Sequence, residues 1–316
     1  MNEVELIDLI LDRLGPAGRA AKLKIGPGDD AAVVEWETEQ ELVVSTDVCL
    51  DGVHVPTNCP GDLVGYRSVA MSVSDIVAMG AVPRYLTIAL TIEHADVDWL
   101  TAFADGVRDG CAEADSTVIG GNLAKGVKQI TITAMGSVPM GQAIKRNTSQ
   151  PKDDIWVTGK LGATPLALQA MAAWIPRGLS ELKQLTSTDV IARYLLPPIR
   201  TSFVECLRHY ASACTDITDG LAFELDRLVS GAPKGYRIET EEIPLWFSAE
   251  LDDVLANDDS YEMLFTSSAE NREAVQHYAK KSNIPLSRIG TVLSTLDREF
   301  VPFRELRSPV SGFSHF

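Results

Sequence analysis

The sequence of 316 residues lacks the features of membrane-spanning, secreted, disulfide-rich and zinc-binding proteins. No apolar run approaches the ~20 residues that a membrane-spanning helix needs, so we expect no membrane partner. The first residues, MNEVELIDLILDRLG, are acidic and amphipathic, whereas a secretory signal opens with positive charge. Five cysteines form no C-x-x-C pair. Their odd number favours reduced thiols in the cytoplasm over a disulfide framework or a zinc site.

Positive charge is also scarce, because 28 Lys and Arg residues stand against 44 Asp and Glu residues and give a formal net charge of −16. The chain has no Lys/Arg-rich run, so we expect no nucleic-acid partner, since such binding depends on basic side chains. Excess acid either keeps a protein soluble or is gathered locally to hold cations. Only the positions of the acids can separate these two interpretations.

Strand and helix patterns alternate along the whole chain, which predicts an α/β (α+β) class with mixed sheets packed against helices. The length favours two domains. A polar, Pro-containing stretch at 145–154 suggests domains at 1–148 and 149–316. Apolar spacing predicts helices, and alternation predicts strands, at these segments: helices 3–14, 66–79, 96–114 and 162–174; strands 40–47, 85–92, 116–122, 128–138, 154–159, 262–267 and 288–294.

One predicted helix contains a carboxylate that its composition does not explain. The segment SVAMSVSDIVAMG, residues 68–80, has Asp75 as its only charged side chain. A carboxylate buried without a partner would cost several kcal/mol or would protonate. One interpretation is an ion pair with Arg67 or Arg84, or a cap on a nearby backbone turn; the other is a bound cation.

Further aspartates stand where the backbone changes from one element to the next. Asp29 and Asp30 follow a Gly-Pro-Gly turn, Asp47 ends a predicted strand, and Asp216 and Asp219 precede a helix in TDITDGL. Such junctions form the rims of active sites in α/β proteins. Carboxylates that converge repel one another, and divalent cations relieve the repulsion. Oxygen ligands without Cys or His at metal spacing favour Mg²⁺ over Zn²⁺, and no EF-hand loop for Ca²⁺ is present.

Glycines near these aspartates allow the backbone to approach an anion closely. They occur in GPGDD, VIGGN and VTGKLGAT, but neither a Walker A sequence nor a G-x-G-x-x-G turn is present. Any one of them alone is equally an ordinary tight turn. Together with the aspartates they indicate a site for Mg²⁺-bound polyphosphate, in which metal ions bridge phosphate oxygens and protein carboxylates.

Several of these segments follow one another in a familiar order: GPGDDAAVV, STDVCLDGVHV, AMSVSDIVAMGAVP, VIGGN, GQAIKR, DITDGL and the terminal GFSHF. In this the chain resembles the thiamine-monophosphate kinases of the aminoimidazole-ribonucleotide-synthetase-like ATP-binding superfamily. The resemblance implies ATP-dependent phosphorylation of thiamine monophosphate to thiamine diphosphate by direct in-line transfer, with several Mg²⁺ ions. It also implies a homodimer joined through the sheets of the first domains, which would bind Mg²⁺ and ATP while the second domain completes the site.

The resemblance assigns roles to residues that match the family motifs. The acceptor phosphate is already ionised near neutral pH, so no catalytic base is assigned. Without the resemblance, His54 would be an ordinary surface histidine, Arg146 a solvated charge and Phe313 a hydrophobic plug. The assigned sets are metal ligands Asp30, Ser45, Thr46, Asp47, Asp75, Asn122, Asp216 and Asp219; ATP-binding residues Gly121, Asn122, Arg146 and Thr218; and substrate-binding residues His54, Asp259 and Phe313.

The chain departs from the family pattern in three places. Ser72 stands where Asn is common, and Asn122 where Asp is frequent. The family segment G-G-E-D-Y-E-L-L-F-T is NDDSYEMLFT here, residues 257–266, with Asp259 in place of a substrate-contacting Glu. This last change leaves two alternatives open. One is another ATP-dependent synthetase or kinase of the superfamily with a different substrate, and the other is a nucleotide-binding homologue with impaired catalysis.

Overall fold

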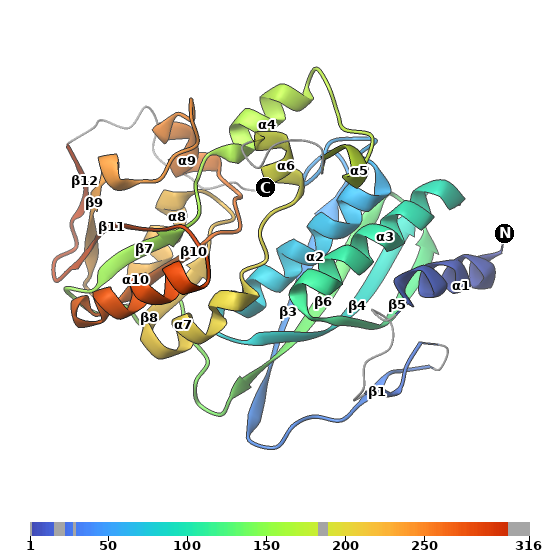
Figure 1. Ribbon diagram of the computed structural model, residues 1–316, viewed down its shortest axis with the longest axis horizontal. Helices are drawn as coiled ribbons and strands as arrows, with labels where there is room; N and C mark the ends of the chain where they lie inside the picture. The colour runs from blue at the N-terminus through green and yellow to red at the C-terminus, as the bar shows by residue number, and fades with distance from the viewer. Residues whose placement is uncertain (1, 16–22, 28–29, 183–188, 303–316) are drawn as a thin grey trace. The chain divides into compact units, whose positions relative to one another are not determined.

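A computed structural model describes residues 2–15, 23–27, 30–182 and 189–302 (Figure 1). The chain forms two compact units, and each contains a mixed sheet packed against helices, which confirms the predicted class. The first unit comprises residues 1–76, 81–141 and 171–199, and the second comprises 77–80, 142–170 and 200–316. Within the described residues, every helix is too short or too polar to cross a bilayer.

The first unit is built on a four-stranded sheet in the order β3-β6-β4-β5. Neighbouring strands are antiparallel except β4 and β5, which run parallel. The short strands β1 and β2 pair separately. The bounds are β1 Leu23–Ile25, β2 Val33–Val34, β3 Gln40–Leu50, β4 Val82–Ile92, β5 Thr117–Lys125 and β6 Gln129–Pro139.

The two faces of this sheet have different environments. On β6, Ile130, Ile132 and Ala134 are buried, whereas Thr131 and Thr133 between them are half-buried. Successive strand residues point to opposite faces, so one face is covered and the other is open. The covering helices are α2 (Gly61–Ala78) and α3 (Val97–Ala114), and α1 (Glu3–Leu14) packs beside α3 (Figure 1). We call these the helix-covered face and the open face.

Glycines bring α2 and α3 into backbone contact. A β-carbon on Gly65 would lie 2.3 Å from the carbonyl oxygen of Phe103, and one on Gly106 would lie 1.9 Å from that of Asp62. Both distances are far below van der Waals contact, so only glycine permits this approach. The helix that carries Asp75 is therefore held tightly against its neighbour.

The second unit has a six-stranded sheet in the order β12-β9-β11-β7-β10-β8. Its neighbouring strands are antiparallel except β12 and β9. All five residues of the central strand β7 are buried, which indicates that helices cover both faces. The bounds are β7 Asp154–Thr158, β8 Ala211–Asp216, β9 Gly235–Glu239, β10 Met263–Ser267, β11 Leu286–Leu293 and β12 Arg298–Val301.

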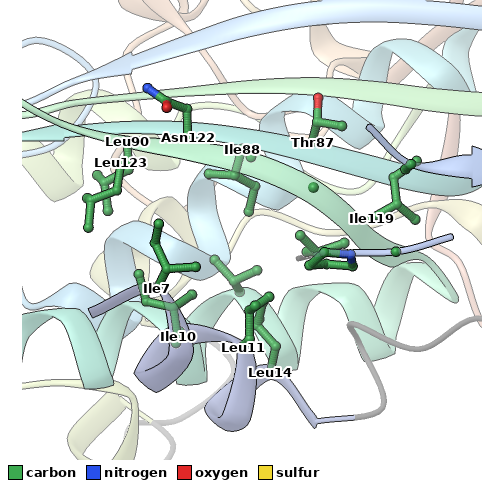
Figure 2. Close-up of a pocket in the computed structure, with 18 of the residues that line it drawn as sticks. Ile7, Ile10, Leu11, Leu14, Thr87, Ile88, Leu90, Ile119, Asn122 and Leu123 are labelled. Carbon is green, nitrogen blue, oxygen red and sulfur yellow. The ribbon is translucent and has the colours of Figure 1, made fainter. Parts of the chain in front are cut away.

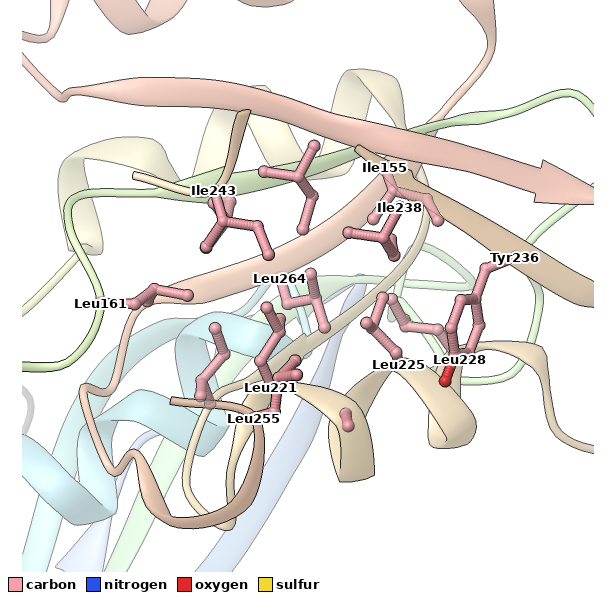
Figure 3. Close-up of a cluster of buried hydrophobic side chains, with 14 of the residues drawn as sticks. Ile155, Leu161, Leu221, Leu225, Leu228, Tyr236, Ile238, Ile243, Leu255 and Leu264 are labelled. Carbon is pink, nitrogen blue, oxygen red and sulfur yellow. The ribbon is translucent and has the colours of Figure 1, made fainter. Parts of the chain in front are cut away.

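The helices of the second unit enclose that sheet. On one face, α8 (Leu221–Val229) and α9 (Leu251–Asn257) bury a cluster of aliphatic side chains against the strands (Figure 3). On the other, the ring of Phe265 packs against Trp156 and Phe203, and Phe203 also contacts Tyr278. Its other helices are α4 (Ala163–Met171), α7 (Val204–Tyr210) and α10 (Arg272–Lys281), with short 3-10 turns at Thr201–Phe203, Thr240–Glu242 and Ala269–Asn271. The short helices α5 (Leu179–Leu182) and α6 (Val190–Leu195) belong to the first unit.

Candidate active site

Asp75 lies on an otherwise apolar, buried part of α2. Throughout this helix, all of which the structure describes, only Asp62 and Asp75 are not fully buried. The Ser45 hydroxyl on β3 donates to Asp75 Oδ2 at 2.5 Å. The arginines that could have neutralised Asp75 are engaged elsewhere: Arg67 donates to backbone carbonyls and Arg84 to the Ser137 hydroxyl. The ion-pair interpretation of Asp75 is therefore wrong.

Asp47 lies two residues after Ser45 on β3, on the same helix-covered face. Burial, together with the nearby negative charge of Asp75, raises the pKa of Asp47 from 3.8 to about 6. Two half-buried carboxylates thus lie close enough to repel each other, and no Lys or Arg of the described chain forms an ion pair with either of them. A divalent cation would relieve their repulsion.

This pair suits Mg²⁺ in its chemistry. Mg²⁺ commonly binds through one or two carboxylates and completes its octahedron with water and substrate phosphates. Among the described residues no group of three or more His, Cys, Asp or Glu side chains is arranged to hold a metal ion, so an all-protein cage is not what they offer. The donor set of Asp47, Asp75 and the Ser45 hydroxyl fits a metal ion that arrives with a phosphate ligand.

The side chains of Thr46 and Asn122 lie on the open face, away from this pair. Thr46 pairs with Thr133 across β3 and β6, and their hydroxyl oxygens are 3.0 Å apart. Asn122 pairs with Ala89 on β4, and Figure 2 shows its side chain pointing away from α1. Of the predicted metal ligands in the first unit, Ser45, Asp47 and Asp75 come together, and the Thr46 and Asn122 side chains do not join them.

A cavity of about 610 Å³ lies between α1, α3 and the strands β4 and β5 (Figure 2). Its wall is mainly aliphatic, with Phe103 as an aromatic member. Asp30, Gly121 and Asn122, all predicted to bind metal or nucleotide, are among the lining residues. No Lys or Arg of the described chain lines it. The apolar lining consists of Val4, Ile7, Ile10, Leu11, Leu14, Pro27, Ala31, Ala32, Ile88, Leu90, Phe103, Ala104, Val107, Val118, Ile119 and Leu123.

Gly121 has a structural reason to be glycine as well as a predicted functional one. A β-carbon there would lie 2.2 Å from the carbonyl oxygen of Ile88 on the paired strand. The backbone of β5 therefore runs unusually close to β4 at the edge of the cavity. This exposed stretch of main chain is open to a ligand that binds backbone amides.

In the second unit, the predicted residues of TDITDGL lie at the end of β8 and in the turn before α8. Asp216 is buried, and Thr218 and Asp219 are half-buried. The Thr218 hydroxyl is 3.3 Å from Asp219 Oδ2 and 3.4 Å from Glu224 Oε1. Arg146, predicted to bind ATP, is exposed; burial raises the pKa of Glu224, and the positive charge of Arg146 slightly opposes that rise. The structure thus gathers Asp219, Thr218 and Arg146 around Glu224.

Glu224 is a member of this group that the sequence analysis missed. Its side chain is fully buried and accepts hydrogen bonds from Thr215 and from Arg227 Nη1 at 3.2 and 3.1 Å. Burial raises the pKa of its carboxyl group, against the opposing charge of Arg227. The signal was available, because Glu224 follows Leu221 by three residues and so falls on the apolar stripe of α8. The same reasoning had singled out Asp75.

The predicted substrate residues come from both units. The Nδ1 atom of His54 accepts the Leu50 backbone N–H at 3.0 Å, in the loop after β3. In the second unit, Asp259 accepts the Thr164 hydroxyl at 2.5 Å, and its neighbour Asp258 is buried and accepts the Gly162 N–H at 3.1 Å. Phe313 lies outside the described residues. The unusual 257–266 segment thus runs from the end of α9 through a hydrogen-bonded connection at 258–262 into β10.

Two family models match this chain. Residues 28–138 match the family model for the AIR synthase related protein, N-terminal domain, and residues 150–299 match that for the C-terminal domain. The thiamine-monophosphate kinase of Salmonella typhimurium is 32% identical over 99% of this chain and 98% of its own length. The chain belongs to the thiamine-monophosphate kinase family.

Solved structures of thiamine-monophosphate kinases share the fold. The crystal structure of the kinase from Stenotrophomonas maltophilia K279a is 31% identical with a TM-score of 0.84, over 95% of this chain and 97% of that chain. AaThiL complexed with AMPPCP and TMP is 26% identical with a TM-score of 0.74, over 99% and 97%. The resemblance that the sequence motifs indicated is therefore confirmed over nearly the whole length of this chain.

Proposed function

We propose that the protein phosphorylates thiamine monophosphate to thiamine diphosphate with ATP as the phosphoryl donor. The observation that carries the proposal is the full-length similarity to curated thiamine-monophosphate kinases at 32% identity. The geometry supports it, because Asp47 and Asp75 form a carboxylate pair suited to Mg²⁺. AMPPCP is an ATP analogue, so the AaThiL complex supports ATP as co-substrate.

In this proposal a phosphate oxygen of thiamine monophosphate attacks the γ-phosphorus of ATP in line. The new P–O bond forms as the bond from the γ-phosphorus to the bridging oxygen breaks, and ADP leaves. The attacking oxygen is ionised, so no protein base is needed, and positioning and charge stabilisation provide the catalysis. Asp47, Asp75 and Ser45 would hold Mg²⁺ in the first unit, and Asp30, Asp216 and Asp219 are proposed for further ions. Bound Mg²⁺ neutralises phosphate charge.

The test is an assay of the purified protein with ATP, Mg²⁺ and thiamine monophosphate, followed by chromatography of thiamine diphosphate and ADP. Equal amounts of both products are expected, and chelation of Mg²⁺ should stop the reaction. Thiamine and purine-nucleotide precursors serve as alternative acceptors, because the 257–266 segment departs from the family pattern. ADP release with one of those acceptors, and none with thiamine monophosphate, would favour a synthetase or kinase of the same superfamily that acts on a different substrate. Binding of Mg-ATP without any product would indicate an impaired homologue.

The cavity beside α1 is proposed to receive the nucleoside end of ATP. Its aliphatic wall and its lack of basic residues among the described lining suit a neutral base rather than a phosphate. Gly121, Asn122 and Asp30 at the same cavity would then be near the phosphates, with Arg146 and Thr218 contributed by the second unit.

Filling this cavity should weaken ATP binding selectively. In Ile7→Trp the larger side chain occupies the cavity, and we expect the KM for ATP to rise roughly tenfold, which corresponds to ~1.4 kcal/mol, with the KM for thiamine monophosphate unchanged. Leu9→Trp adds the same bulk to α1 at a residue that does not line the cavity and is the control. Equal ATP kinetics in the two variants would place the nucleoside elsewhere.

The open face of the first sheet is proposed to bind a second copy of the chain. Leu42, Val44 and Val48 on β3 are 52%, 53% and 36% exposed, and all point to this face. A row of exposed aliphatic side chains on a sheet favours association. We expect sedimentation equilibrium at micromolar concentration to give twice the chain mass, and Val44→Asp to give the monomer. A wild-type monomer would contradict the homodimer.

The remaining assignments follow from the same proposal. We propose that the first domain binds Mg²⁺ and ATP and that the second domain completes the nucleotide and substrate site. We place the reaction in the cytoplasm, supported by five cysteines that are all buried and unpaired. Recovery of the enzyme from a periplasmic or secreted fraction would contradict this location.

A further inference from the structure

Part of the chain between β7 and β8 belongs to the first unit although the strands on either side belong to the second. We call its described residues, 171–182 and 189–199, the strap. The Leu179 N–H donates to Asp62 Oδ2 at 2.7 Å, near the N-terminus of α2. A β-carbon on Gly178 would lie 2.7 Å from the same oxygen. The strap is thus anchored on α2 at its first helical turn.

A second anchor lies five residues further along α2, at Arg67. Its side chain is fully buried, and its guanidinium carbon lies 3.9 Å from the ring centroid of Tyr194 in the strap. The guanidinium group also donates to the Tyr194 carbonyl oxygen through Nη1 and to the His54 carbonyl oxygen through Nε, the latter at 3.0 Å. A buried arginine that stacks on an aromatic ring and donates in several directions fixes its partners in one arrangement.

The same carbonyl of His54 accepts a second bond from the strap, because the Tyr194 hydroxyl donates to it at 3.0 Å. Within the loop, the Leu50 carbonyl accepts the N–H groups of Val53 and His54 at 3.2 and 3.0 Å. The Leu50 N–H in turn donates to His54 Nδ1. When the ring is neutral its proton is therefore on Nε2, the atom that could donate to an anionic group.

We propose that Tyr194 and Arg67 are positioning residues for the acceptor substrate, acting through the backbone of His54. Tyr194 and Arg67 converge on one carbonyl oxygen, and the imidazole of that residue is oriented by the N–H of Leu50 at the end of β3. The strap thereby sets the direction in which His54 presents its ring to the phosphate of thiamine monophosphate. The inference rests on the proposed function and extends it to residues outside the family motifs.

The decisive variant is Tyr194→Phe, which keeps the ring over Arg67 and removes only the hydroxyl. We expect the KM for thiamine monophosphate to rise roughly fivefold, as for the loss of one hydrogen bond of about 1 kcal/mol, with the kcat and the KM for ATP little changed. Tyr66→Phe is the matched control. Tyr66 is the neighbour of Arg67 on α2 and is also buried, but its hydroxyl bonds Glu113 on α3.

A double-mutant cycle separates positioning from general stability. His54→Ala should raise the KM for thiamine monophosphate by itself, and Tyr194→Phe should add nothing in that background if it acts through His54. Arg67→Lys keeps the positive charge without the planar group, and it should raise the same KM and lower the melting temperature.

The outcomes are distinguishable. An unchanged KM in Tyr194→Phe, equal effects in Tyr66→Phe, or additive effects with His54→Ala would overturn the inference while leaving the kinase proposal intact. Failure of the wild-type protein to form thiamine diphosphate would overturn the kinase proposal, and the inference with it.

Discussion

The Asp47→Asn variant should be more stable than the wild type without metal and should turn over roughly 100-fold more slowly. Asparagine keeps the shape of the side chain and removes its charge. The repulsion from Asp75 and the cost of burying a second carboxylate then disappear. In the proposed mechanism the same change would remove a charged ligand of Mg²⁺, so stability and activity should move in opposite directions.

The pH dependence of this effect has a definite sign. Below pH 3.8 Asp47 is protonated in both the folded and the unfolded chain and contributes nothing. Between pH 3.8 and about 6 the folded chain retains a proton that the unfolded chain has lost, so the free energy of unfolding falls as the pH rises. At 1.36 kcal/mol per pH unit, the fall is about 3 kcal/mol, and above pH 6 it is constant.

Urea unfolding in EDTA from pH 4 to 7.5 measures this fall. Asp47→Asn should lack it, and Asp12→Asn, an exposed carboxylate on α1, should behave as the wild type. Addition of Mg²⁺ at pH 7 should stabilise the wild type more than Asp47→Asn. Wild-type turnover in Asp47→Asn would show that Asp47 is not part of the active site. If the free energy of unfolding of Asp47→Asn fell with pH as in the wild type, the pKa of Asp47 would not be the cause of that fall.

The second large effect is expected at the ion pair between Arg200 and Glu262. Two bonds join them, from Arg200 Nε to Glu262 Oε2 at 2.8 Å and from Nη2 to Oε1 at 2.6 Å. The glutamate is fully buried, and the arginine side chain is 16% exposed. Arg200→Met should therefore lower the free energy of unfolding by about 3–4 kcal/mol, since it leaves a buried carboxylate without its cation.

An exposed ion pair provides the control for this prediction. Arg237 and Glu299 also meet at 2.6 Å, but their side chains are 52% and 35% exposed. Arg237→Met should cost less than about 1 kcal/mol, because solvent screens the pair. Chemical denaturation of both variants at pH 7 makes the comparison. Similar losses in the two would show that burial does not control the strength of the Arg200 pair.

Much of the fold could be predicted from the spacing of apolar residues and from composition, but the contacts between helices could not. The apolar spacing predicted α1 over the residues it occupies, and the strand alternation placed β4, β5 and β6 within three residues of their ends. The start of α2 was missed by five residues, because Gly61 and Gly65 read as helix breakers. They are helical because α3 approaches so closely that a side chain would not fit.

The candidate site was predictable to a similar degree. A charge within an apolar helix identified Asp75. The end of a predicted strand identified Asp47 and the motif resemblance Ser45, and the structure places both near Asp75. The Thr46 side chain points away from them because successive side chains of a strand point to opposite faces. This alternation was visible in the sequence, but Thr46 was assigned from the family motif instead. The strap could not be foreseen, since its return to the first unit depends on contacts with α2 that leave no periodic pattern.

The alternation of β3 has a consequence for how this strand can vary. Ser45 and Asp47 serve one face, while Val44, Thr46 and Val48 serve the other. A point substitution can therefore change the ligands on the helix-covered face without changing the tendency of the open face to associate, or the reverse. A one-residue insertion or deletion would move both sets of side chains to the opposite face at once. The strand should therefore tolerate substitutions far better than changes in its length.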